Sequence, residues 1–187
     1  SYTMVDPLFG HSSRPVELDL GTGKGAFLVA LASRYPDRLV LGSDIMIGRL
    51  RKVAGKAHRA GLENVELLRA ESQALVGYQL PDACIDRAHL LCPDPWPKKR
   101  HRPRRLITTD FATRMARVLR PGGTFHFATD DVPYLSKVVE IFTALDTLFR
   151  LDPAPSAIAD IADLKTDFEC IWLHHGRQVP HVAFARC

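Results

Sequence analysis

The sequence is poor in cysteine and has no long apolar run. Its four cysteines include no C-x-x-C pair, which argues against a structural zinc site or a disulfide framework and favours a reducing compartment. No apolar stretch approaches the length that crosses a bilayer. Residues 1–6 also lack the basic segment leading into an apolar one that marks a signal peptide. We therefore expect a cytoplasmic protein with no metal and no membrane partner.

What the sequence does have is the composition of a soluble globular domain. Of its 187 residues, 46% are hydrophobic and 25% are charged, which is enough apolar material for one sizeable core. No internal repeat or low-complexity tract divides the chain. We expect a single domain over residues 1–187, in which residues 1–15 form a short N-terminal segment, present as a monomer or a homodimer.

Apolar segments alternate along the chain between strand-like and helix-like periodicity. Short buried runs predict strands at 16–20, 39–44, 65–68, 85–92 and 124–129. Helical patterns cover 26–34, 47–60 and 106–119, and Asp130 or Asp131 caps a further helix with Pro133 near its start. After a loop at 152–163, strands at 168–173 and 181–185 are expected to form an antiparallel hairpin. This order predicts an α/β fold, a mostly parallel sheet with helices on both faces.

Glycines and acidic residues lie at or just beyond the expected strand ends, where ligands bind in such sheets. The first of these loops contains Gly21, Gly23 and Gly25, which let the backbone approach a ligand closely. Asp44 can accept hydrogen bonds from both hydroxyls of a ribose. These two features fit either a dinucleotide or S-adenosylmethionine. Asp19 favours the latter, because a carboxylate beside the glycines attracts a sulfonium and an amino group but repels a pyrophosphate. Glu71 would accept from an adenine amino group.

The positive charge of the chain is concentrated in one segment. Residues 98–105 contain six Lys or Arg, whereas the whole chain carries +4, which leaves about −2 on the rest. The segment follows Asp94, whose backbone is restricted by Pro95 and Pro97. This combination suits a polyanionic substrate whose phosphates bind the cations while one base reaches Asp94. The cations expected to contact phosphates are Lys98, Lys99, Arg100, Arg104 and Arg105.

Four motifs resemble the bacterial tRNA (guanine-N7)-methyltransferases, over a stretch from about Val16 to the C-terminus. They are Glu17-Leu18-Asp19-Leu20-Gly21-Thr22-Gly23-Lys24-Gly25, Asp94-Pro95-Trp96-Pro97-Lys98-Lys99-Arg100-His101 with Arg104-Arg105, Thr129-Asp130, and Thr166-Asp167-Phe168-Glu169. The second is highly specific, whereas the glycine loop alone is weak evidence. The resemblance implies a class I S-adenosylmethionine-dependent methyltransferase (Rossmann-like) fold with a seven-stranded sheet. It further implies S-adenosylmethionine as donor and a guanine in the variable loop of tRNA as acceptor.

The resemblance also implies roles for single residues. Asp94 would be catalytic and lie between cofactor and substrate, with Asp19, Asp44 and Glu71 on the cofactor side. The residues that would contact the guanosine are Lys98, Asp130, Thr166, Asp167, Phe168 and Glu169. The chain departs from the family at positions 19 and 44, where Glu is more usual than Asp. It also departs in its short N-terminal segment, which bears on substrate affinity more than on chemistry.

Methylation of guanine N7 makes modest demands on these residues. N7 carries a free lone pair, so no proton must leave before methylation. A carboxylate of Asp94, Asp130 or Glu169 could accept from the guanine N1–H and N2 amino group and so favour the cation that forms.

Asp94-Pro95-Trp96-Pro97 is also close to the motif of amino-group nucleic-acid methyltransferases. A nicotinamide oxidoreductase is disfavoured by Asp19, and a non-catalytic RNA-binding module stays open.

Overall fold

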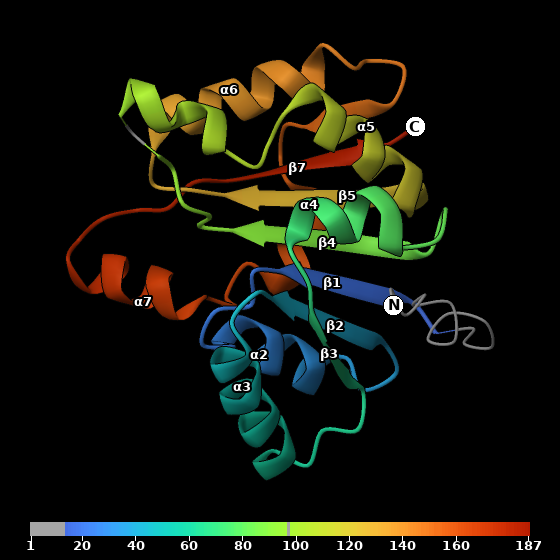
Figure 1. The fold of residues 1–187 in the computed structure, drawn as a ribbon, viewed down its shortest axis with the longest axis vertical. Coiled ribbons are helices and arrows are strands. Elements are labelled where there is room, and N and C mark those ends of the chain that lie inside the picture. Colours follow the sequence, from blue (N-terminus) through green and yellow to red (C-terminus); the bar gives the residue numbers. More distant parts are fainter. Residues whose placement is uncertain (1–13, 97) are drawn as a thin grey trace.

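The architecture is a seven-stranded sheet in the order β3-β2-β1-β4-β5-β7-β6 (Figure 1). The structure, a computed structural model, describes residues 14–96 and 98–187, apart from the side chains of Lys99 and Arg102. Five neighbouring strands are parallel: β1 (Val16–Leu20), β2 (Leu39–Asp44), β3 (Val65–Arg69), β4 (Ile85–Leu91) and β5 (Leu119–Ala128). β7 (His181–Arg186) is antiparallel to both β5 and β6 (Phe149–Asp152).

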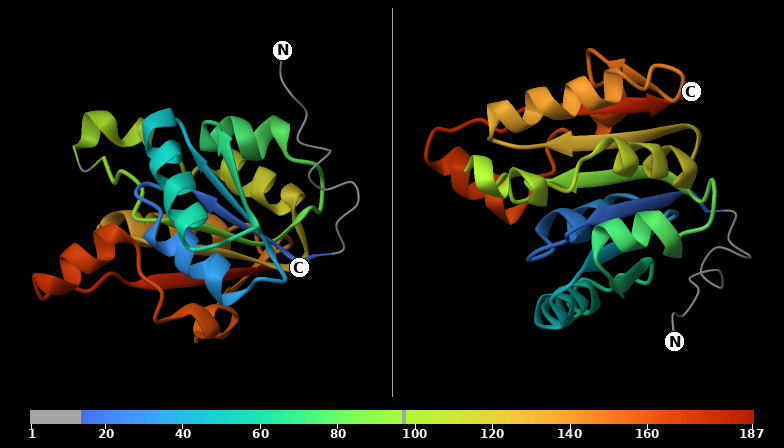
Figure 2. Two further views of the ribbon diagram at one scale, coloured as in Figure 1. Left: turned by 90° about the horizontal axis from the view of Figure 1, so that it is seen from below. Right: turned by 45° about the horizontal axis from the view of Figure 1, so that its top comes forward.

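Helices cover both faces of the sheet (Figure 2). On one face lie α2 (Ala26–Arg34), α3 (Ile47–Arg59) and the 3-10 helix η3 (Ser156–Ile161). On the other lie α4 (Ser72–Ala74), the π-helix η1 (Leu75–Gln79), α5 (Thr109–Val118) and α6 (Val132–Thr143). The 3-10 helix η2 (Lys99–Arg104) precedes α5, and α7 (Asp167–His174) lies beyond the carboxyl ends of β4 and β5 (Figure 1).

The two faces of the sheet differ in polarity. The face under α5 and α6 is apolar, with Phe142 stacked on Phe125 at 4.9 Å and on Phe184 at 4.4 Å between ring centroids. The opposite face buries ionisable side chains among its apolar ones, including Glu17 and His89. Buried polar groups need partners, and those partners form part of the site described below.

Most predicted elements are confirmed, including the mostly parallel sheet of an α/β fold and a C-terminal antiparallel hairpin. Asp131 caps α6, since its Oδ1 accepts from the amide of Tyr134 at 2.7 Å, and Pro133 lies in the first turn. The predicted strand at 168–173 is wrong, because this segment is helix α7, and the partner of β7 in the hairpin is β6. A capping box between Thr166 and Glu169 begins the helix. No helix within 14–96 and 98–187 is long and apolar enough to cross a membrane.

Candidate active site

The glycine loop joins β1 to α2 at the carboxyl edge of the sheet. The amides of Gly21 and Thr22 both donate to the carbonyl of Ser43, at 2.9 Å, which ties the loop to the end of β2. Gly25, with φ of +82°, immediately precedes α2, and a Cβ there would lie 2.7 Å from Cγ2 of Val53. Glycine at this position therefore permits both the turn and the close packing of α2 against α3.

Asp19 presents a buried carboxyl group to the same place. Its residue is 4% exposed, yet the side chain lines a cavity together with Gly21 and Gly23. Among the described residues, no donor or cation contacts this carboxyl group. Burial, reinforced by the negative charge of Asp44, raises the pKa of Asp19 to about 7. A cation that enters the cavity would stabilise the ionised form.

Asp44 fixes the end of β2 to its surroundings. Its Oδ2 accepts from the amide of Gly23 at 3.3 Å, and its Oδ1 accepts from the amide of Met46 at 2.8 Å. The guanidinium of Arg49, on α3, lies 3.5 Å from Oδ2. The carboxylate therefore braces the glycine loop while it borders a cavity.

Two adjoining cavities of about 500 Å³ each open at this edge and share Asp94. The glycine-loop cavity is lined by Asp19, Gly21, Gly23, Asp94, Asp130, Thr166, Asp167 and Phe168, among others. The Asp44 cavity is lined by Gly21, Asp44, Glu71, Asp94, Arg104 and Arg105, among others. Asp94 thus lies in one cleft with the glycine loop, and the basic segment borders it, as the sequence predicts.

The loop that carries Asp94 is held in a strained conformation. Cys92 and Trp96, the residues two before and two after Asp94, have φ of +50° and +43°, in the left-handed region that β-carbon-bearing residues rarely adopt. The amide of Cys92 donates to the carbonyl of Ala128 at 2.8 Å, and Nε of Arg105 donates to the carbonyl of Pro95 at 2.7 Å. These anchors leave the side chain of Asp94 exposed between the two cavities.

Arg105, predicted to contact phosphate, has an internal role in the structure. Its side chain is 9% exposed, and besides Pro95 it contacts Oδ1 of Asp131 at 3.3 Å. The guanidinium also lies over the ring of Tyr134, 4.4 Å from its centroid. Arg105 therefore joins the Asp94 loop to the start of α6.

The other described basic side chains of this segment are exposed, unlike that of Arg105. Lys98 and Arg100 are exposed, and Arg104 is exposed while its guanidinium lies 5.0 Å from the ring centroid of Trp96. The side chain of Lys99 lies outside the described residues. Arg104 lines the Asp44 cavity, whereas Lys98 and Arg100 line neither cavity and are exposed in the same segment. The contact of these three cations with phosphate stays a prediction.

α7 forms a wall of the glycine-loop cavity. Thr166, Asp167 and Phe168 line it, and Oδ2 of Asp167 accepts from the amide of Ala26 at 3.1 Å. This bond joins the start of α7 to the start of α2, directly after the glycine loop. Residues that the sequence places 141 positions apart therefore meet in one wall.

Glu71 lines the Asp44 cavity, whereas Glu169 is buried behind the start of α7 and lines neither cavity, and both carboxylates accept hydrogen bonds within the protein. Glu169 is 1% exposed; its Oε2 accepts from the amide of Thr166 at 2.9 Å and its Oε1 contacts Nε2 of His181 at 2.8 Å. Glu71 caps α4 by accepting from the amides of Gln73 and Ala74 at 3.2 and 3.1 Å. The predicted contacts of Glu169 with guanine and of Glu71 with adenine stay predictions.

Comparison with known proteins identifies the family of this chain. A family model described as "Putative methyltransferase" matches residues 13–182. A tRNA (guanine-N(7)-)-methyltransferase of Paracoccus denitrificans is 41% identical over 71% of the chain, and one of Caulobacter vibrioides is 36% identical over 82%. The chain belongs to the tRNA (guanine-N7)-methyltransferase family. It spans 56% of the Paracoccus relative and 68% of the Caulobacter relative, so about half to two thirds of their lengths.

Solved structures of other methyltransferases share the fold of this family member. The 16S rRNA methyltransferase KamB matches with a TM-score of 0.68 and 23% identity, covering 97% of this chain and 91% of that one. A putative methyltransferase of Streptococcus mutans, solved in complex with SAH, gives a TM-score of 0.60 at 15% identity, with 93% and 89% covered. At such identities the likeness concerns the fold alone.

Sequence reasoning missed several residues of the cleft. Arg49 lines both cavities, although a basic helix face is more often solvated; its one signal is its position five residues after Asp44. Trp172, expected in a strand, lines the glycine-loop cavity from α7, and its indole N–H is buried without an acceptor among the described residues. A helical period over 168–172 was the available signal for that residue.

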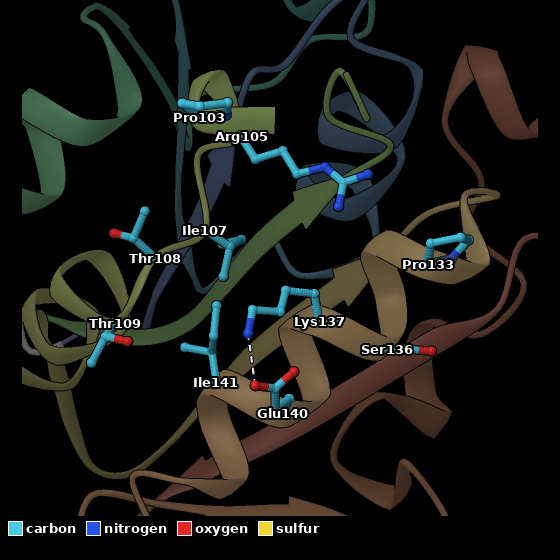
Figure 3. Close-up of a pocket in the computed structure, with 10 residues that line it drawn as sticks. All are labelled: Pro103, Arg105, Ile107, Thr108, Thr109, Pro133, Ser136, Lys137, Glu140 and Ile141. Carbon is cyan, nitrogen blue, oxygen red and sulfur yellow. Dashed lines mark hydrogen bonds and ion pairs between the residues drawn. The ribbon is translucent and has the colours of Figure 1, made fainter. Parts of the chain in front are cut away.

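A separate hollow of about 580 Å³ lies between the segment before α5 and the helix α6 (Figure 3). Its lining includes the ion pair of Lys137 and Glu140 on α6, 2.7 Å apart (Figure 3). Arg105 is the predicted site residue that reaches it. We assign no part of the cleft chemistry to this hollow.

Proposed function

We propose that this chain transfers the methyl group of S-adenosylmethionine to N7 of a guanine in the variable loop of tRNA. The observation that carries the proposal is the position of Asp94, which borders both the glycine-loop cavity and the Asp44 cavity. A group between two adjoining cavities can contact a methyl donor in one and a base in the other. The family to which the chain belongs, and the names of its relatives, support the same reaction.

The residues of the cleft fit the proposed donor. The carboxyl group of Asp19 is buried beside the glycine loop without a partner among the described residues, so it suits the positive ammonium and sulfonium groups of this molecule. The glycine loop admits a ligand against its backbone, and Asp44 borders the neighbouring cavity. When bound, S-adenosylmethionine supplies an electrophilic methyl group on a positively charged sulfur.

The protein's own contribution is orientation and electrostatics. Because N7 needs no deprotonation, no general base is required. The exposed carboxylate of Asp94 can accept from the N1–H and N2 amino group of a guanine, and so stabilise the positive charge that develops on the ring. Phe168, which is 45% exposed at the rim of the cavity, offers a surface on which the base can stack. Fixing the reacting atoms in line supplies much of the remaining rate.

The mouth of the cleft suits the backbone of an RNA. Lys98, Arg100 and Arg104 are exposed in the segment that follows Asp94 and would bind phosphates without regard to sequence. Selection of one guanine would then fall to the cavity itself.

A methylation assay with a matched control tests the proposal. The protein is incubated with tRNA and a donor labelled in its methyl group, and the modified nucleoside is located by cleavage at N7-alkylated guanine. Asp94→Ala should lower kcat by about a hundredfold or more, the scale for loss of a charge-stabilising group. Asp37→Asn, which neutralises an exposed aspartate between α2 and β2, should leave the rate unchanged.

Other results would assign a different function. A labelled exocyclic amine would identify an amino-group methyltransferase. Saturable tRNA binding without donor binding would identify a non-catalytic RNA-binding module. Full activity of Asp94→Ala would refute the role of that carboxylate.

A further inference from the structure

A continuous line of hydrogen-bonded side chains crosses the buried polar face of the sheet. Oε2 of Glu17 lies 2.8 Å from Nε2 of His89, and Nδ1 of His89 lies 2.9 Å from Nδ1 of His126. Nε2 of His126 lies 2.8 Å from Nδ1 of His181, whose Nε2 lies 2.8 Å from Oε1 of Glu169. The histidines come from three adjacent strands, β4, β5 and β7, and Glu17 comes from the next strand, β1.

A proton count shows that this line of side chains holds one more N–H proton than three neutral histidines provide. Its four contacts each need one N–H proton if both carboxylates are ionised. Three neutral imidazoles carry three N–H protons. One contact of 2.8–2.9 Å would then join two lone pairs, which repel each other. A fourth proton, which converts one imidazole to imidazolium, satisfies every contact.

The surroundings indicate where this proton resides. Burial and the neighbouring histidines lower the pKa of His126 well below its usual value. Burial also lowers the pKa of His89, although Glu17 opposes the effect. His181 is the ring of the three that reaches solvent, with its side chain 20% exposed, and it contacts a carboxylate. With the charge on His181, neutral His126 donates to His89 and His89 donates to Glu17.

Both ends of the line are anchored to charged groups. At the inner end Glu17 binds Arg87 at 2.9 Å and also Arg38, and Arg87 in turn contacts Asp160 at 2.8 Å. At the outer end the ammonium of Lys165 lies 3.9 Å from Glu169. The thiol of Cys92 and the carboxylate of Asp130 lie near the same end. Because several ion pairs hold the inner end, the line can fix the position of Glu169.

Because Glu169 holds the first turn of α7, its position also sets the position of the residues of α7 that line the cleft. It forms the capping box with Thr166, and Thr166, Asp167 and Phe168 line the glycine-loop cavity. We propose that His181 is a positioning residue for substrate, and that the proton shared along Glu17, His89, His126, His181 and Glu169 holds the start of α7 in place as the wall against which the base binds. This inference rests on the proposed function for its substrate but not for its proton count.

Nuclear magnetic resonance tests the proton count without any activity. In protein labelled with ¹⁵N histidine, assigned through single His→Gln variants, the rings of His89, His126 and His181 should show four N–H protons protected from exchange. Two of the four should belong to His181. Three protected protons in total would overturn the shared proton, whether or not the protein methylates tRNA.

Steady-state kinetics tests the positioning role. His181→Phe should raise KM for tRNA about tenfold or more, the factor that follows from loss of a charge-assisted hydrogen bond. KM for the methyl donor should change far less, because the hydrogen bond from the amide of Ala26 to Asp167 still holds the start of α7 beside the glycine loop. His58→Phe, a change of an exposed histidine on α3, should alter neither constant.

A conservative variant separates positioning from folding. His181→Gln retains an amide donor for Glu169 but cannot carry the charge, so it should fold and restore part of the tRNA affinity. An unchanged KM for tRNA in folded His181→Phe and His181→Gln would overturn the positioning role. Absence of N7 methylation by the unaltered protein would instead refute the proposed function.

Discussion

Replacing Asp19 with asparagine should stabilise the ligand-free protein while it removes donor binding. The carboxyl group has a pKa of about 7 in the folded chain against an ordinary value of 3.8. Because the folded pKa is raised, the folded state holds the proton more tightly than the unfolded state. Any stability from this group is therefore present below pH 4 and is lost as the pH rises through 7.

The size of the effect follows from this difference in pKa. Relative to a side chain that is always neutral, ionisable Asp19 costs about 2 kcal/mol of folding free energy at pH 5 and about 4 kcal/mol at pH 8. These are upper values, because a buried asparagine also needs hydrogen-bond partners. Asp19→Asn should thus unfold at a higher urea concentration than the unaltered protein, and the advantage should grow between pH 5 and pH 8.

Urea unfolding at the two pH values, with and without S-adenosylmethionine, measures both consequences. In the ligand-free state the stability difference between variant and unaltered protein should increase with pH. Addition of the donor should stabilise the unaltered protein and leave Asp19→Asn unaffected. Asp146→Asn, which removes an exposed charge elsewhere, should show neither behaviour. A difference that is the same at pH 5 and pH 8 would refute the argument.

Two further predictions contrast the exposed and the internal cations of the basic segment. Changing Lys98 and Arg100 together to Ala should weaken tRNA binding and reduce the slope of log K against log salt by about 1 to 2, which titrations at several salt concentrations would measure; an unchanged slope would show that phosphates bind elsewhere. Arg105→Ala should leave that slope unchanged but lower the free energy of unfolding by about 2–3 kcal/mol, since it removes hydrogen bonds to Pro95 and Asp131, and urea unfolding would check this.

The periodicity of the sequence predicted the parallel half of the sheet because each strand there is a short apolar run between turn signals. The C-terminal part was harder. In 168–173, aromatic and β-branched residues resemble a strand, but the capping box at Thr166 decides for a helix. β6 was missed because its four residues, Phe149–Asp152, alternate only once between buried and exposed positions.

The candidate cleft was predictable in part for the same reason. Asp19 and Asp44 lie in the last two residues of β1 and β2, and Asp94 lies three residues after β4, so the topology alone brings them to one edge. The line of histidines was not predictable, since His89, His126 and His181 lie far apart in sequence and meet through strand pairing. Likewise, composition does not distinguish Arg105, which is internal, from the exposed Arg104 beside it.

The basic segment supports the conformation of the Asp94 loop. Left-handed backbone at Cys92 and Trp96 costs roughly 1–3 kcal/mol at each residue, so the loop keeps this shape only if other contacts fix it. Arg105 binds the carbonyl of Pro95, and Arg104 covers the ring of Trp96. Two residues of a segment that sequence alone assigns wholly to RNA therefore support the turn that presents Asp94. An RNA phosphate that drew Arg104 away from Trp96 would loosen this turn, which couples the grip on the RNA backbone to the position of the carboxylate.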